Sequence, residues 1–170
     1  MTEHKFDFHF IKNEIRKKTF GIITTLNKDG SPHTSGILYG VSNQDEKFAL
    51  YLLTYKKNKK VRNIQRNPKV SFIIPFPHHI LRFVPSGAIT INGIAKILPV
   101  NTKEIIQTFS EKKILRQVIA DIDFENDMKY VFVKIEPDPK IFCYGVGFNI
   151  LKLRSSHTTG GYSVTIPDES

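Results

Sequence analysis

The spacing of apolar residues changes from helical to strand-like within the first part of the chain. Apolar positions three and four residues apart predict an amphipathic helix over residues 7–17, with Asp7 as its N-cap. Residues 19–26 are rich in β-branched side chains and predict a strand. Residues 27–30, Asn-Lys-Asp-Gly, are typical of a hairpin turn, so residues 32–42 are expected to return as a second strand.

Strand-like spacing recurs through the rest of the chain, with helical segments between the strands. Further strands are expected over residues 48–54, 69–74, 88–98, 129–136 and 141–145. Asn92-Gly93 predicts a bulge or bend in the third of these, and Pro137-Asp138-Pro139 predicts a turn between the last two. Helices are expected over residues 57–66, from a capping pattern at 101–104 onward, and from Ser110 to Ala120.

This order of elements favours a mainly β (α+β) fold. Six or seven short strands with few helices are typical of an antiparallel sheet that closes into a barrel. The helices interrupt the strands too irregularly for a doubly wound parallel sheet. We expect one domain over residues 1–153 and a mobile C-terminal tail over residues 154–170, which is rich in Ser, Thr and Gly.

The positive charge of the chain is local. The stretch from Lys47 to Lys103 contains eleven of the 25 Lys and Arg residues but none of the 16 Asp and Glu residues. The formal net charge of +9 therefore arises mainly there, around the predicted helix over residues 57–66. Unpaired like charges repel one another, so this stretch predicts contact with an anion.

The remaining composition narrows the function classes. A single cysteine, Cys143, excludes an internal disulfide and suits a reducing cytoplasm. The N-terminal residues contain no apolar signal region, and no apolar run approaches the roughly 20 residues of a membrane span. We therefore expect a cytoplasmic protein with no membrane partner. His78 and His79 are adjacent, point apart and lack a third ligand at a usable spacing, so we expect no metal site.

Three motifs occur in a fixed order along the chain. The first is the apolar strand followed by Asp29-Gly30-Ser31-Pro32. The second is a strand that ends in Thr54, followed by Asn58-Lys59-Lys60 and Asn67-Pro68-Lys69-Val70. The third is Ile91-Asn92-Gly93-Ile94-Ala95. In order and spacing these motifs resemble the pyridoxamine 5′-phosphate oxidase-like, FMN-binding split barrels, over roughly residues 15–144.

The resemblance implies a six- to seven-stranded antiparallel split β-barrel with short flanking helices, assembled as a homodimer. It implies an oxidoreductase that binds FMN at the subunit interface and acts on a small cytosolic molecule. The flavin would carry the redox chemistry, which is why no catalytic residue is assigned. The cofactor-binding positions carried over from the family are Ser35, Gly36, Ile37, Leu38, Leu53, Thr54, Asn58, Lys59 and Lys60.

Elementary electrostatics supports the phosphate part of this site. The first turn of a helix offers unpaired backbone N–H groups and the positive end of the helix dipole. Asn58, Lys59 and Lys60 add an amide and two ammonium groups at that position. Charge-assisted hydrogen bonds of this kind are roughly twice as strong as neutral ones.

The sequence departs from the oxidase at the substrate site. Ser35 and Gly40 stand where the oxidase has an Arg and a Lys, and Ala88 stands where it has a Gln. A pyridoxamine phosphate substrate is therefore not expected. The alternatives on the same fold are an F420-dependent reductase, a haem-binding relative and a flavin-binding protein without turnover. A basic nucleic-acid-binding protein is a rival of a different class, but the basic run lacks interleaved aromatics or a recognition motif.

Overall fold

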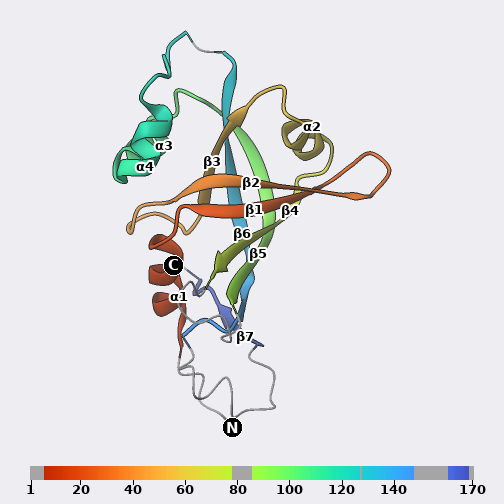
Figure 1. The fold of residues 1–170 in the computed structure, drawn as a ribbon, viewed down its shortest axis with the longest axis vertical. Coiled ribbons are helices and arrows are strands. Elements are labelled where there is room, and N and C mark those ends of the chain that lie inside the picture. The colour runs from red at the N-terminus through yellow and green to blue at the C-terminus, as the bar shows by residue number, and fades with distance from the viewer. Residues whose placement is uncertain (1–5, 78–85, 127, 148–160, 169–170) are drawn as a thin grey trace.

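The computed structural model describes residues 6–77, 86–126, 128–147 and 161–168. Within them the chain forms seven strands and four short helices (Figure 1). In chain order these are α1 (Phe8–Arg16), β1 (Phe20–Leu26), β2 (Pro32–Val41), β3 (Leu50–Tyr55), α2 (Lys59–Arg66), β4 (Lys69–Phe76), β5 (Gly87–Pro99), α3 (Lys103–Ser110), α4 (Lys113–Ile119), β6 (Tyr130–Tyr144) and β7 (Gly161–Thr165).

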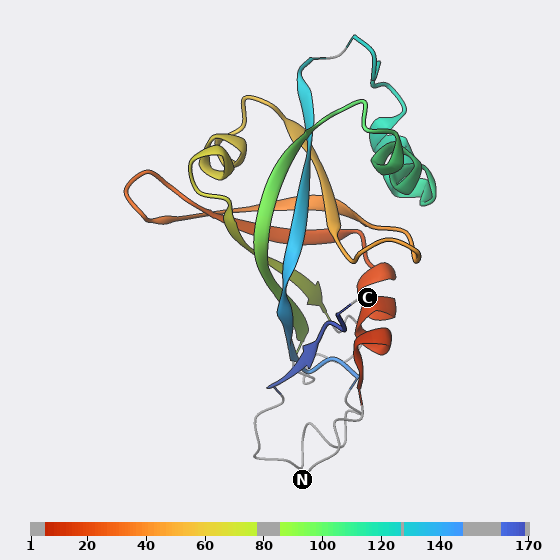
Figure 2. The same ribbon diagram turned by 180° about the vertical axis from the view of Figure 1, so that it is seen from behind.

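The strands form one antiparallel sheet that closes on itself. Their order is β3-β2-β1-β4-β5-β6-β7, and an additional pairing of β3 with β6 closes a six-stranded barrel. Strand β7 lies outside this ring and pairs with the far end of β6. The long strands β5 and β6 cross the molecule from end to end (Figure 2). The predicted barrel class is therefore confirmed.

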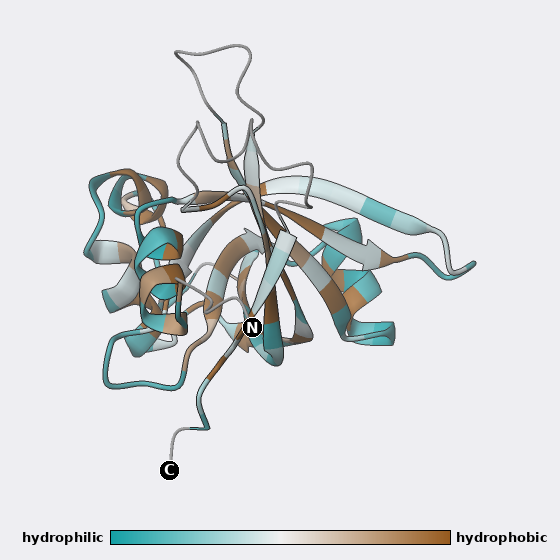
Figure 3. Cartoon of the chain, turned by 90° about the horizontal axis from the view of Figure 1, so that it is seen from below, coloured by the Kyte–Doolittle hydropathy of each residue, from teal (hydrophilic) through white to brown (hydrophobic). Residues whose placement is uncertain are grey.

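Alternation along the strands places one set of side chains in the barrel. Ile23, Tyr39, Leu52, Phe72 and Ile89 are fully buried in this core. A second apolar cluster lies outside the barrel wall, between α3, α4 and the strands that they cover. Apolar residues accordingly gather on the strands and on the inner faces of the helices, whereas α2, at the right of Figure 3, is mainly hydrophilic.

The bulge predicted at Asn92-Gly93 is confirmed. The register between β5 and β6 shifts between Ile91 and Gly93. A Cβ atom at Gly93 would lie 2.2 Å from the carbonyl oxygen of Glu136, so only glycine fits this close approach of two backbones.

The predicted turn at Pro137-Asp138-Pro139 is wrong, because β6 continues through it as one strand. On its β3 side, β6 pairs as far as Ile135, and pairing with β7 begins only at Lys140. The prolines lie in the gap between these two partners. A missing N–H group breaks no ladder there, which is why the strand tolerates them.

The C-terminal expectation also needs correction. Residues 154–160 and 169–170 lie outside the described residues, but Gly161–Thr165 forms β7 instead of a mobile tail. Tyr162 and Val164 face β6 and the N-terminal helix, and the Tyr162 hydroxyl donates to the carbonyl of Val146 at 2.9 Å. Sequence composition alone did not reveal a partner strand for this segment.

The predicted helices are present with smaller bounds, and one of the two predicted N-caps is wrong. Asp7 caps α1 as expected, accepting a hydrogen bond from the N–H of Phe10 at 2.8 Å. Ser110 is the last residue of α3 and does not cap α4, because its hydroxyl donates to the carbonyl of Ile106. The N-cap of α4 is Lys112.

Candidate functional site

The predicted phosphate site lies at the start of α2, just after β3 ends. Asn58 occupies the N-cap position, but its side chain does not cap the helix. Its amide donates instead to the hydroxyl of the buried Thr54 at 2.8 Å. The first turn of α2 contains no acidic residue. The N–H groups at this helix end therefore lack a side-chain cap, and the positive end of the helix dipole lies there.

Lys59 and Lys60 lie on different faces of α2, because consecutive residues of a helix point in different directions. Lys60 precedes the buried Val61 and is itself half-buried, and this burial lowers its pKa from the ordinary lysine value. Lys59 is exposed and lies toward the β1–β2 hairpin. Hydrogen bonds from Ser31 lower the pKa of Asp29 in that hairpin, and the charge of Lys59 adds a smaller effect in the same direction. The structure thus separates the two predicted lysines.

The four predicted positions on β2 alternate between two faces. Ser35 and Ile37 pair with Ile23 and Gly21 and point into the barrel. The Ser35 hydroxyl is buried and has no hydrogen-bond partner among the described residues. Such an unsatisfied polar atom is costly unless a further group satisfies it.

Gly36 and Leu38 point outward instead. A Cβ atom at Gly36 would lie 2.9 Å from the Phe20 ring, so the glycine leaves room beside an aromatic ring that is 48% exposed. Leu38 and the predicted Leu53 both pack against the outer apolar cluster. Gly36, Leu38 and Leu53 can therefore contribute an apolar wall and backbone groups to a ligand on the outer face.

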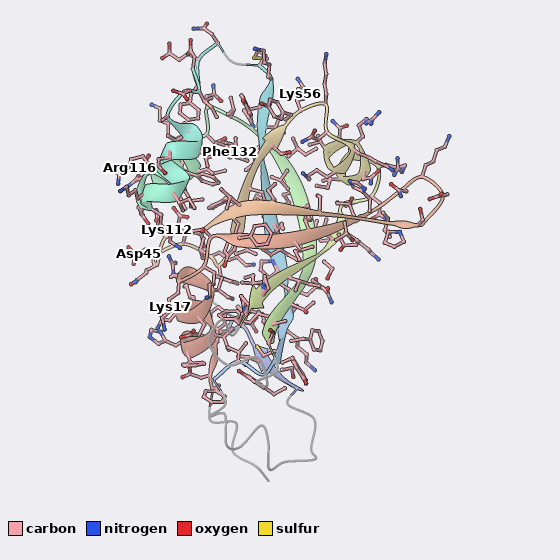
Figure 4. The ribbon with its side chains drawn as sticks, in the orientation of Figure 1. Lys17, Asp45, Lys56, Lys112, Arg116 and Phe132 are labelled. Carbon is pink, nitrogen blue, oxygen red and sulfur yellow. The ribbon has the colours of Figure 1, made fainter. Side chains whose placement is uncertain are left out.

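The predicted positions on β2 and β3 lie on both sides of the barrel wall. In Figure 1, α3 and α4 lie to one side of β3 and α2 lies to the other. Of the predicted residues, the structure joins Thr54 directly to Asn58 and places Leu38 and Leu53 in one cluster. Ser35 and Ile37 lie behind the wall, inside the barrel. The exposed Lys56, in the turn before α2, points away from the barrel (Figure 4).

A polar network beside this site was missed from the sequence. Asn63, only 3% exposed, donates to the Thr25 hydroxyl at 3.0 Å and to the Asn27 side-chain oxygen at 3.2 Å. Arg66 donates to the Asn63 side-chain oxygen at 2.9 Å and to the carbonyl of Leu26 at 2.8 Å. The network ties the second half of α2 to the β1–β2 hairpin.

The same network forms the floor of a groove of about 640 Å³ between α2 and the hairpin. We call this the basic groove, since its lining includes four cationic residues and one acidic residue, namely Lys28, Lys59, Arg62, Arg66 and Asp29. The helical spacing of Lys59, Arg62 and Arg66 was the signal in the sequence that could have revealed it.

Two further observations concern the departures from the oxidase. A Cβ atom at Gly40 would lie 3.1 Å from Thr108 and 3.3 Å from Phe109 of α3, so this position is filled by the helix and cannot carry a ligand-binding side chain. Ala88 pairs with Tyr144 on the outer face of the sheet. The oxidase substrate contacts expected at these positions have no counterpart in this chain.

Among the described residues, no group of three His, Cys, Asp or Glu side chains is placed to hold a metal ion. His78 and His79 lie outside the described residues. None of the helices in the described ranges is long and apolar enough to cross a bilayer.

The residues present fit a cofactor with an anionic end. The uncapped start of α2, the half-buried ammonium group of Lys60 and the unsatisfied hydroxyl of Ser35 all lack an internal counterpart within the described chain. An anionic group at the helix end would accept hydrogen bonds from the uncapped N–H groups and pair with the ammonium group of Lys60.

Comparisons with known proteins agree with this geometry. Solved structures with the same fold include a conserved hypothetical protein from Mycobacterium tuberculosis, with a TM-score of 0.64 and 17% identity over 94% of each chain. A haem storage protein from Vibrio cholerae matches with a TM-score of 0.61 and 15% identity, over 80% of this chain and 94% of that one. An FAD-binding protein from Mesorhizobium loti matches with a TM-score of 0.54 and 18% identity, over 80% and 90%.

At these identities the structural matches establish the fold alone. No curated protein matches the chain at a significant level. The family model described as pyridoxamine 5′-phosphate oxidase matches residues 9–138, which include β1 to β5, α2 to α4, all but the first residue of α1 and most of β6. Because this match spans well over half of the sequence, the chain belongs to the pyridoxamine 5′-phosphate oxidase family.

Proposed function

We propose that this chain is an FMN-binding oxidoreductase that acts on a small cytosolic molecule. The observation that carries the proposal is the start of α2, where an uncapped helix end and the half-buried Lys60 meet with no acidic residue in the first turn. A phosphate monoester is a dianion, and both features stabilise it. Asn58, held by Thr54, would add an amide group beside the phosphate.

The flavin ring would lie over the outer face of β2 and β3. Gly36, Leu38 and Leu53 offer the apolar wall, and the exposed Phe20 ring stands beside Gly36. When bound, the flavin supplies two-electron redox chemistry, and the protein positions it and excludes water. Lys60 would hold the negative charge of the phosphate, which is remote from the reacting ring.

We also propose that the functional unit is a homodimer, because the outer face of the sheet includes an apolar row that none of the described residues covers. Strand pairing aligns Ile22, Ile73 and Phe142 in one row across the sheet through Thr90. The neighbouring row contains Tyr144, and both Phe142 and Tyr144 are 48% exposed. Large exposed apolar patches of this kind are typical of protein interfaces. A second copy would bury them and complete the flavin site from its other side.

Cofactor identity is tested by purifying the protein and recording its spectrum. A flavin absorption band that dithionite bleaches supports the proposal. A Soret band would favour haem, which proteins of this fold from Mycobacterium smegmatis and Vibrio cholerae bind or store. Equilibrium dialysis with FMN and F420 in parallel separates the flavin from the deazaflavin. Catalysis is then tested by whether reduced cofactor is reoxidised by a substrate.

The phosphate site is tested by titrating FMN and riboflavin into matched variants. We expect Lys60→Gln to weaken FMN binding about tenfold or more and to leave riboflavin binding unchanged, since riboflavin has no phosphate. Lys57→Gln is the control, because Lys57 is exposed in the turn before α2. Equal effects of the two substitutions on FMN would contradict the site.

The dimer is tested by light scattering after gel filtration. We expect about twice the 19.5 kDa mass of the chain, and Phe142→Glu should shift the protein to the monomer mass. Val118→Glu, on the exposed face of α4, is the control. A monomer mass for the unaltered chain would contradict the proposal.

A further inference from the structure

An apolar pocket lies where β5 ends and β6 begins. Its volume of about 380 Å³ falls within the range of roughly 300–1,000 Å³ that is usual for small-molecule sites. Its apolar lining comes from the end of β5, from the segment between α4 and β6 and from the first residue of β6, and includes Leu98, Val100, Phe124, Met128 and Tyr130. We call this the rim pocket.

The charged groups of the rim pocket lie at its mouth. Apart from the Tyr130 hydroxyl, the polar side chains of its lining are those of Lys56, Asn101 and Glu125, and all three residues are exposed. Their formal charges sum to zero. The Tyr130 hydroxyl donates to the Tyr55 hydroxyl at 3.0 Å. A charged ligand group inside the pocket would lose its hydration without a buried partner, so the interior favours an uncharged molecule.

The rim pocket adjoins the apolar wall that we assign to the flavin. Leu98 and Tyr130 pack against the same outer apolar cluster as Leu38 and Leu53. Strand pairing places Leu53 opposite Phe132, so Tyr130 is the diagonal neighbour of Leu53 on β6. Diagonal neighbours on paired strands are roughly 7–8 Å apart. A molecule in the rim pocket would therefore lie beside the edge of the proposed flavin site.

The other side of the flavin wall is filled by α3. A Cβ atom at Gly40 would lie 3.1 Å from Thr108 and 3.3 Å from Phe109, so the helix occupies the space in front of this position. The rim pocket is also separate from the patch that we assign to the dimer, because Phe142 and Tyr144 lie at the opposite end of β6. Next to the flavin wall, the rim pocket is thus the place with volume for a substrate.

We propose that the rim pocket binds the apolar part of the substrate, which is a small uncharged molecule with an aromatic body. This inference rests on the function proposed above and names the substrate class of that site. Burial of apolar surface supplies the driving force for binding. The rings of Phe124 and Tyr130 line the pocket and suit a planar aromatic molecule, since aromatic pairs stack in offset or edge-to-face arrangements.

The test compares two ligands on four forms of the full-length chain, each with and without FMN. Calorimetry measures the affinities of 1-naphthol, an uncharged aromatic molecule, and of pyridoxamine 5′-phosphate, a charged one. The double pocket variant is Phe124→Ser/Met128→Ser, and its control is Ile114→Ser/Val118→Ser on the exposed face of α4. Met128→Glu is a second pocket variant. Met128 is 74% exposed, so this variant should keep the melting temperature of the unaltered chain.

We expect the unaltered chain to bind 1-naphthol at least about tenfold more tightly than pyridoxamine 5′-phosphate. The double pocket variant should lose about tenfold or more of its affinity for 1-naphthol, Met128→Glu about threefold, and the control less than about twofold. Because the pocket adjoins the flavin wall, 1-naphthol should also shift the flavin absorption band of the unaltered chain and of the control. It should not do so in the double pocket variant.

Three outcomes would overturn the inference and leave the proposed function intact. The first is an affinity for 1-naphthol that is equal in the pocket variants and the control. The second is binding of 1-naphthol that leaves the flavin band unchanged. The third is a monomer mass for Met128→Glu where the unaltered chain is a dimer, which would make the pocket a contact between copies. Failure of the unaltered chain to bind FMN would instead overturn the proposed function, while 1-naphthol binding to the chain without FMN still measures the pocket by itself.

Discussion

Two helical covers, the α3–α4 pair and α2, pack on the barrel, and different interactions hold each of them in place. The α3–α4 cover is fixed by apolar packing, in which Phe109, Leu115 and Phe132 are fully buried. Helix α2 also buries Val61, but its position against the hairpin is fixed by the hydrogen bonds of Asn63. Apolar packing tolerates small shifts, whereas a satisfied polar network allows one arrangement. The cover with the polar network is the one on which the candidate site is built.

Each cover also contains a half-buried lysine, and the two are used differently. Lys112 of the α3–α4 cover donates to the carbonyls of Arg16 and Lys18 at the end of α1, and lies where α4 meets α1 (Figure 4). Its pKa is lowered by burial and by the nearby charge of Arg16. Burial alone lowers the pKa of Lys60, and its ammonium group has no hydrogen bond or ion pair with the described residues. Lys112 is thus a structural cap, and Lys60 is available to a ligand.

The largest effect is expected in the apolar cover. Phe109→Ala removes a ring that is fully buried and contacts Phe132 at a centroid distance of 5.5 Å. The cavity left behind should lower the free energy of unfolding by about 3–5 kcal/mol. Urea denaturation measures this loss, with Val118→Ala on the exposed face of α4 as the control, expected within about 0.5 kcal/mol. A loss below about 1 kcal/mol for Phe109→Ala would mean that packing does not hold this cover.

A smaller loss of stability, with a functional consequence, is expected in the polar cover. Asn63→Ala leaves the partners of the amide unsatisfied and should cost about 1–3 kcal/mol. Because the network holds the second half of α2 against the hairpin, its loss should also shift the start of this short helix, so we expect weaker FMN binding. Gln65→Ala, on the exposed side of the same helix, is the control. If FMN affinity survives in Asn63→Ala, the network serves stability and has no part in positioning the site.

Replacing each of the two half-buried lysines, Lys60 and Lys112, by Met should change the free energy of unfolding in opposite directions at pH 7. Burial lowers the pKa of Lys60, so below the ordinary lysine pKa of 10.5 the unfolded chain binds more protons than the folded one, and stability rises with pH. Lys60→Met removes the cost of burying this charge, so we expect the variant to be more stable than the unaltered chain at pH 7. The difference in the free energy of unfolding should be smaller at pH 10.

Lys112→Met supplies the matched comparison. It loses the hydrogen bonds to Arg16 and Lys18 and should be destabilising at both pH values. Urea denaturation at pH 7 and pH 10 measures both variants. A stability difference for Lys60→Met that does not change with pH would contradict the assignment.

The smallest effect is expected on the surface between the covers. The rings of Tyr55 and Tyr130 stack with centroids 4.6 Å apart, and their hydroxyls are 3.0 Å apart. Tyr55 is 52% exposed, so water can replace this hydrogen bond. We expect Tyr55→Phe to change the free energy of unfolding by no more than about 0.5 kcal/mol. A loss above about 1 kcal/mol would show that the pair braces the start of α2.

Periodicity in the sequence was sufficient for most of the barrel. The hairpin of β1 and β2, the helix ended by Pro68 and the bulge at Gly93 each follow from local rules of backbone geometry. Pro137 and Pro139 misled because the tolerance of a strand for proline depends on which neighbour it pairs with, and that neighbour is distant in sequence. The strand in the C-terminal segment was missed for the same reason.

Some features of the candidate site could be predicted from the sequence, and others depend on the tertiary structure. The sequence by itself determined that basic residues gather where β3 passes into α2, because charge and helix boundaries are local properties. Only the tertiary structure decided that Lys60 is half-buried, that Lys59 faces the hairpin instead, and that Asn63 meets Thr25 from 38 residues away. The physical reason is that burial and hydrogen-bond partnership depend on the closure of the barrel, which brings distant strands and α2 together.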